Sequence, residues 1–293
     1  MAHDYLSTDT LMEHVMDSEE FHFPRAMGGE VKIPQPFKDF EPKELLPAKL
    51  PIPAKPLTMR LTKFMVLEVI AAFLIAFVFI RLARKISTGK RPTGKFWNFF
   101  ESMIVFIRDE VARPAIGHHD GDKFLPFLWT MFFFILFNNL LGMLPWMGAA
   151  TGGFGTTLAL AFGTFLVVVG SGMKKMGFVG FFKSLVPHME LPLVMAIVIF
   201  PMVFLIEIAG LLIKHFILAV RLVANMMAGH LVLATLIAFI GVAWNTMAVY
   251  GVAPASVLGA TALSLLELFV AFLQAYIFTF LSALFIGMAV HPH

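Results

Sequence analysis

The stretch AVRLVANMMAGHL, residues 219–231, places an arginine inside sequence that is otherwise almost wholly apolar from about residue 191 to residue 244. Asn225 and His230 follow Arg221 within the same stretch. A charged side chain at the centre of a membrane helix costs about 2.5–3.5 kcal/mol on insertion scales. Either the fold hides this charge or the function needs it, and its depth in apolar sequence favours a functional role.

The composition is typical of a membrane protein. Of the 293 residues, 59% are hydrophobic, 14% are charged and 33 are phenylalanine. Several apolar runs exceed about 18 residues, a length that is typical of a membrane-spanning helix. The chain has no cysteine, which excludes disulfides and thiolate chemistry. Its acidic first twenty residues lack the apolar core of a signal peptide.

Hydropathy divides the chain into a polar, proline-rich segment, residues 1–63, and a single membrane domain, residues 64–293. We expect the first segment to be extended and outside the bilayer, because its prolines disfavour a long helix. The sequence predicts an all-α polytopic membrane protein with one amphipathic helix along the interface at 96–114. The five predicted crossings are residues 64–82, 124–146, 154–172, 191–244 and 257–289.

The apolar block 191–244 allows two interpretations. As one helix it would be about 80 Å long, against a hydrocarbon core of ~30 Å. It is therefore either two spans with a tight turn or one strongly tilted helix. Between Glu207 and His230 there is no proline and there are only two glycines, which favours one long helix. With the last helix it forms a hairpin around the polar turn 244–256.

Charge predicts the orientation of the chain. Basic residues without any acid follow the first span, so the loop there is expected to be cytoplasmic by the positive-inside rule. The N-terminus is then outside and the C-terminus cytoplasmic. The basic residues are Arg81, Arg84, Lys85, Lys90, Arg91 and Lys95.

Polar residues of the long helix share one stripe. At 100° per residue, Lys214, Arg221 and Asn225 lie at about −20°, −40° and 0° from Glu207. On the last helix Glu267 and Gln274 are seven residues apart on one face, with Ser264 beside them. Two such stripes in neighbouring, oppositely directed helices predict a shared interface.

The hairpin register predicts which of these residues meet. With the turn centred near residue 249, His230 and Glu267 lie at similar depth and can be in contact. Arg221 lies near the level of Gln274, and Glu207 lies about four turns further toward the cytoplasm.

Structural roles compete with functional ones. Asn225 and Gln274 could simply hydrogen-bond two helices together, worth about 1 kcal/mol. Lys214 could snorkel to the interface or form a salt bridge with Glu207. His118, His119 and Asp120 are expected in a solvated loop, and neither they nor the terminal HPH has the spacing of a metal site.

The chemistry of the polar residues suggests proton handling. His230 and Glu267 can both titrate and can relay protons as a coupled pair. Arg221 stays charged at any working pH, so it attracts a carboxylate but passes no proton. The residues therefore predict an outer path through His230 and Glu267 and an inner path past Glu207, separated by Arg221. A carboxylate on a moving partner could visit both paths.

These residues resemble subunit a of the F-type ATP synthases. RLVANMMAGHLVL is similar to that family's central motif, LELFVAFLQAYIFTFL (266–281) to its last-helix motif, and FNNLLGMLPW (137–146) to a third stretch. Some members carry an acid at the position of His230 and a histidine at that of Glu267. The resemblance covers roughly residues 64–290 and leaves out the proline-rich N-terminus.

The resemblance implies a function. Arg221 would be the essential arginine facing a rotating ring of c subunits, whose carboxylates carry protons between two half-channels. The subunit makes and breaks no covalent bond itself, so it would be a non-catalytic part of an enzyme complex, with no cofactor and no nucleic acid. Expected partners are the c-ring, the b subunits of the peripheral stalk, the rest of the synthase and lipid. The expected location is a bacterial inner membrane, with an organelle inner membrane as the alternative.

Other classes fit less well. A secondary ion transporter or channel component predicts inverted repeats and unwound half-helices, and neither is evident. An intramembrane hydrolase needs a zinc motif or a nucleophile arrangement, which the motifs do not supply. Coupling to H⁺ or to Na⁺ stays open, because it depends largely on the ring site.

Overall fold

Five long apolar helices dominate the part of the chain that the structure describes, residues 17–22, 30–35, 61–87, 94–144, 147–185, 193–244 and 246–291. In this computed structural model each of the five is long and apolar enough to cross a membrane. They are α2 (Lys63–Ser87), α5 (His118–Gly142), α6 (Phe154–Met176), α8 (Leu193–Ala243) and α9 (Val249–Val290). The predicted all-α polytopic membrane fold is confirmed.

Short elements precede the first of these helices or connect one helix to the next. Two strands, β1 (Glu20–His22) and β2 (Glu30–Lys32), pair antiparallel, with Phe21 opposite Val31. This hairpin lies within the segment 1–63, most of which is outside the described residues. The other short elements are α3 (Lys95–Phe106), the π-helix η3 (Ile107–Ala112), α4 (Arg113–Ile116), the 3₁₀ turn η4 (Ala150–Gly152) and α7 (Phe178–Ser184).

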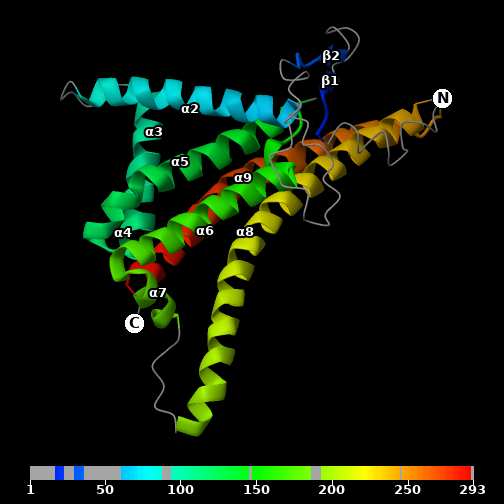
Figure 1. Ribbon diagram of the computed structural model, residues 1–293. Helices are drawn as coiled ribbons and strands as arrows, with labels where there is room; N and C mark the ends of the chain where they lie inside the picture. The colour runs from blue at the N-terminus through cyan, green and yellow to red at the C-terminus, as the bar shows by residue number, and fades with distance from the viewer. Residues whose placement is uncertain are drawn as a thin grey trace.

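The predicted interfacial segment 96–114 is helical and turns away from the end of α2 (Figure 1). It packs on α5, where the Trp129 indole donates a hydrogen bond to the Ile104 carbonyl at 3.1 Å. Its far end is charged, and the Arg108 guanidinium, which donates to Asp109 at 2.9 Å, holds the pKa of that carboxyl below its usual range. Its placement along a membrane surface stays a prediction.

The start of α5 corrects the sequence interpretation. His118, His119 and Asp120 were expected in a solvated loop, but they form the first turn of α5. Gly117, at φ 100°, makes the turn before the helix, and an acid in the first turn suits the helix dipole. Asp120 accepts hydrogen bonds from Lys123 at 2.8 Å and Lys175 at 3.0 Å. Its carboxylate thus fixes the start of α5 to the end of α6.

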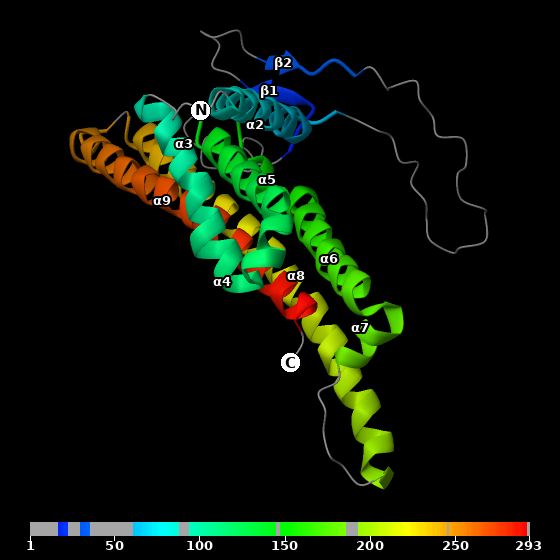
Figure 2. The same ribbon diagram turned by 90° about the vertical axis from the view of Figure 1, so that its left-hand side faces the viewer.

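The long apolar block forms a single helix of 51 residues, α8, as the long-helix interpretation predicted. At 1.5 Å per residue it is about 75 Å long. Its second half packs against α6 and α9, while its first half extends beyond the other helices in both views (Figures 1 and 2). A helix of this length fits a bilayer only when strongly tilted.

The turn between α8 and α9 is shorter than expected. The polar turn was predicted to cover 244–256, but α9 already begins at Val249. Pro254 therefore lies inside the helix. It sits in the second turn, where its missing N–H removes a single backbone hydrogen bond, so the proline does not delay the helix start.

The main core lies where α5 and α9 pack together with α3 and η3. Phenylalanines fill much of it, and Phe79, Phe100, Phe133 and Phe137 form a cluster of ring contacts. On the other side of α9, this core meets α8 through Leu218 and Leu222. The position of α8 is thus set by apolar packing, with its polar residues arranged around that contact.

Candidate functional site

His230 on α8 and Glu267 on α9 face each other across the hairpin. The His230 Nδ1 atom lies 3.8 Å from Glu267 Oε1, and the side chains are 15% and 7% exposed. The contact predicted from the register is therefore present. Both Glu267 oxygens and His230 Nε2 are buried without a hydrogen-bond partner among the described residues. Buried polar atoms are normally hydrogen-bonded, so such a cluster is suited to exchanging protons or binding water.

Gly229 makes room for this pair, a role that sequence reasoning missed. A Cβ atom built at Gly229 would lie 2.8 Å from Glu267 Oε1. Any larger residue would push the carboxylate away. A glycine in a helix interior costs about 1 kcal/mol relative to alanine, so its presence four residues after Asn225 was a usable signal.

A second polar contact lies further along the hairpin. The Asn225 side-chain amide donates a hydrogen bond to Gln274 Oε1 at 2.9 Å. Arg221, one helical turn before Asn225, makes no hydrogen bond to Gln274 in the described chain. With the His230–Glu267 contact, the Asn225–Gln274 bond fixes the register of α8 on α9 at two points.

Arg221 has no hydrogen bond or salt bridge within the described residues, although it is half-buried. It lies at the edge of an exposed stripe of α8 that includes Ile217, Val220, Ala224 and Ala228. Small residues such as the two alanines let another helix approach closely in a membrane. A guanidinium in apolar surroundings is costly, and no anionic side chain of the described residues pairs with it.

The remaining predicted residues do not join a network. Glu207 is half-buried and Lys214 is exposed, and no salt bridge joins them in the described chain. Ser264 is half-buried and makes no hydrogen bond to any described residue. Both Glu207 and Lys214 lie on the part of α8 before its packed second half. Of the predicted stripe on α8, only Asn225 hydrogen-bonds across the interface, to Gln274 of the α9 stripe.

Comparison with known proteins identifies the family. A family profile described as ATP synthase A chain matches residues 65–287. ATP synthase subunit a of Myxococcus xanthus is 42% identical over 240 residues, which is 81% of this chain and 76% of the relative. This chain belongs to the ATP synthase A chain family. Subunit a of Chloroherpeton thalassium is 40% identical over 292 residues, covering 98% of this chain and 78% of the relative. Subunit a 2 of Chlorobaculum tepidum is 39% identical over 289 residues, covering 96% and 72%.

One buried polar residue of this family member was not assigned a role from sequence. Asn139 on α5 donates to the Ala271 carbonyl at 3.3 Å and accepts from the Thr151 hydroxyl at 2.7 Å. It therefore joins α5 and η4 to α9 midway between Glu267 and Gln274. An asparagine inside an apolar helix was the available signal, because such residues usually bond across helices.

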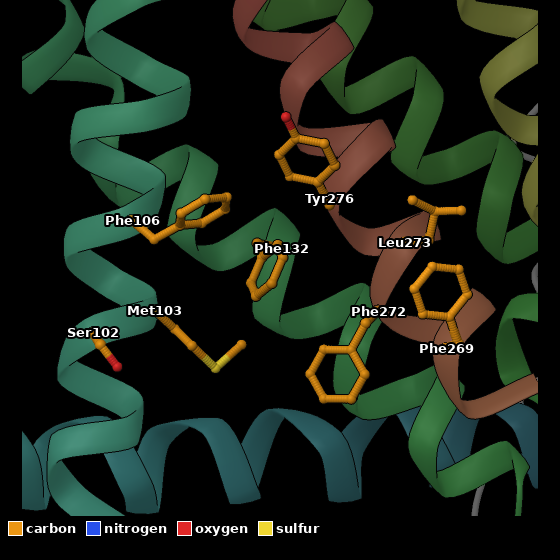
Figure 3. A pocket seen from close by; sticks show the side chains of 8 residues that line it. All are labelled: Ser102, Met103, Phe106, Phe132, Phe269, Phe272, Leu273 and Tyr276. Atoms are coloured by element: carbon orange, nitrogen blue, oxygen red, sulfur yellow. The ribbon is translucent and has the colours of Figure 1, made fainter. Parts of the chain in front are cut away.

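An apolar groove of about 480 Å³ lies between α3 and α9 in this member of the family (Figure 3). Phe106, Phe132, Phe269 and Phe272 line it, and Tyr276 stands at its edge. Its walls offer no carboxylate or histidine, so it cannot relay protons as the His230–Glu267 pair can. Within the described residues, no group of three histidine or acidic side chains could hold a metal ion.

Proposed function

We propose that this chain is the proton-translocating stator subunit of an F-type ATP synthase. The observation that carries the proposal is the pairing of a buried, incompletely bonded His230–Glu267 cluster with Arg221 on the exposed edge of α8. Membership of the ATP synthase A chain family supports it. Partners would be a ring of c subunits, the b subunits of the peripheral stalk and the rest of the synthase.

The outer half-channel would run through His230 and Glu267. Both groups can gain and lose a proton, and a separation of 3.8 Å suits exchange through one intervening water or a small side-chain movement. The Asn225–Gln274 hydrogen bond would hold the two helices in register while the pair changes charge. The pair would then deliver protons to a carboxylate of the ring.

Arg221 would meet the ring carboxylate after it loses its proton. Arginine keeps its charge at any working pH, so it attracts the carboxylate but blocks direct proton leak between the half-channels. In a low-dielectric site two opposite charges attract strongly, which favours release of the proton on the inner side. The exposed stripe with Ala224 and Ala228 would allow the ring helices to approach.

The inner half-channel would pass Glu207, on the part of α8 that extends beyond the other helices. The charge distribution supports an N-terminus outside and a cytoplasmic C-terminus in a bacterial inner membrane. A cysteine replacing Glu207 should then react with a membrane-impermeant maleimide added from the cytoplasmic side. Labelling from the outer side would contradict this assignment.

The decisive test is Arg221→Ala in the assembled complex. Inverted membrane vesicles should lose ATP-driven proton pumping by about a hundredfold or more, because the coupling charge is gone, while the head still hydrolyses ATP. Arg221→Lys should also fail, because a lysine can lose its proton in a dry site. Arg108→Ala is the matched control, since Arg108 pairs with Asp109 away from the site. Unchanged pumping in Arg221→Ala would overturn the proposal.

A further inference from the structure

Lys63, the first residue of α2, is a buried cation that the proposed half-channels do not use. Its side chain is only 2% exposed and is among the largest fully buried side chains of the described chain. Lysine is almost never fully buried unless its charge is paired. Both Lys63 and the residue that approaches it lie before residue 65, where the match to the family profile begins.

The N-terminal segment brings a carboxylate to this lysine. Asp17 Oδ1 accepts a hydrogen bond from the Phe64 backbone N–H at 3.2 Å, and the Ser18 carbonyl accepts one from the Lys63 N–H at 2.9 Å. Asp17 therefore caps the start of α2, where a negative charge is favourable. It also interacts electrostatically with the Lys63 side chain.

The segment that carries Asp17 is folded against the chain. β1 and β2 pair directly after it, and the Ile33 N–H donates to the Glu19 carbonyl at 3.1 Å. The Gln35 side chain both donates to the Leu61 carbonyl at 2.8 Å and accepts from the Leu61 N–H at 2.9 Å. Asp17 is thus held at the start of α2 by several independent hydrogen bonds.

Lys63 also reaches the functional pair. Its charge lies close enough to act electrostatically on His230, although the two residues are on different helices. The loop before η4 closes over it, since a Cβ built at Gly148 would lie 3.5 Å from Lys63 Nζ. Lys63 is therefore within electrostatic range of both Asp17 and His230.

A cavity of about 650 Å³ lies beside these residues. Asp17, Glu68 and Thr156 supply polar walls, and the Thr156 hydroxyl donates to Glu68 Oε1 at 2.6 Å. Its wall includes Met227 of α8, which precedes His230 by three residues and lies on the same face of the helix. At roughly 30 Å³ each, such a volume has room for several waters beside polar partners.

We propose that this cavity, with Asp17 in its wall, is the inlet to the His230–Glu267 pair, and that Asp17 and the neighbouring Lys63 together set the charge between the cavity and the pair. The inference rests on the proposed function and gives the N-terminal segment a role in proton uptake. Lys63 acts through His230 as a positioning residue. Asp17 offsets the Lys63 charge, so removing Asp17 and removing Lys63 change the charge felt by His230 in opposite senses.

The experiment uses the assembled complex in inverted membrane vesicles, with ATP-driven pumping measured over a range of pH. Asp17→Asn keeps the helix-capping oxygen but loses the charge, and Lys63→Met keeps much of the side-chain volume. Each should lower pumping at neutral pH about tenfold, since one nearby charge shifts a protonation equilibrium by that factor or more. The midpoints of the two pH profiles should move in opposite directions, with the double variant between them.

The controls use another ion pair of the same segment. Lys32 Nζ lies 3.5 Å from Glu20 Oε1, and Lys32 is largely exposed. Lys32→Met and Glu20→Gln should leave rate and profile unchanged. Identical pH profiles for Asp17→Asn and wild type would overturn the inference. Asp17 is exposed, so its variant should assemble and decides the test alone if Lys63→Met does not assemble. Arg221→Ala in the same assay separates the two proposals, because pumping that survives that change contradicts the proposed function instead.

Discussion

Helices α5 and α8 are both long and apolar, yet they are used differently. Half of the most apolar window of α5 is buried inside the chain, against 17% for α8. On α5 the buried Asn139 is bonded to neighbours within the chain. On α8, Arg221, Glu207 and Lys214 have no such bonds among the described residues. The comparison separates a helix whose polar residue joins the fold together from one whose charged residues are left unbonded in the described chain, as the proposed contacts with a partner and with protons require.

The comparison is tested most strongly at the contact between α8 and α9. We expect His230→Cys with Glu267→Cys to form a disulfide almost completely under mild oxidation, read as a mobility shift of the chain, which has no native cysteine. His230→Cys with Gln274→Cys is the control, because seven residues separate Glu267 from Gln274 by about 10 Å along the helix. Equal cross-linking of both pairs would show that the register is wrong.

A glycine pair on α8 gives the next largest expected effect. Gly229→Ala places a methyl group against the Glu267 carboxylate, so we expect about 1–3 kcal/mol of strain in the hairpin and slower proton pumping. Gly210→Ala is the matched control, because a Cβ there meets no neighbouring atom within 4 Å. Thermal unfolding in detergent and ATP-driven pumping would be measured for both. Similar behaviour of the two variants would remove the assigned role of Gly229.

The smallest expected effect concerns α5. Asn139→Ala removes the bonds to Thr151 and Ala271, so we expect a loss of about 1 kcal/mol in stability, read as a lower midpoint of unfolding. Pumping by the complex that remains folded should be nearly normal. Thr130→Ala on the same helix is the control, because the Thr130 hydroxyl bonds only within its own helix. A large pumping defect in Asn139→Ala would place α5 in the proton path and weaken the comparison with α8.

The sequence alone determined the membrane class, the five spans, the single long helix and the contact between His230 and Glu267. These follow from hydropathy and from the helical period, which depend on residues close in the chain. The contact between helices could also be predicted, because residues equally far from a tight turn lie side by side in a hairpin. The predicted starts of the helices were less accurate. Polar residues at 118–120 and the proline at 254 suggested loops, but the polar residues are tolerated in the first turn of α5 and the proline in the second turn of α9.

Only the tertiary structure decided the surroundings of the site. The sequence marks Gly229 and Asn139 as unusual residues in apolar helices, but it does not indicate that Gly229 gives space to Glu267 or that Asn139 bonds to Ala271. It also does not indicate that Asp17 caps the start of α2 beside Lys63. Each of these contacts joins elements far apart in sequence, and each depends on how apolar faces pack at native density. A helical pattern states which residues share a face, but packing decides which face meets which partner.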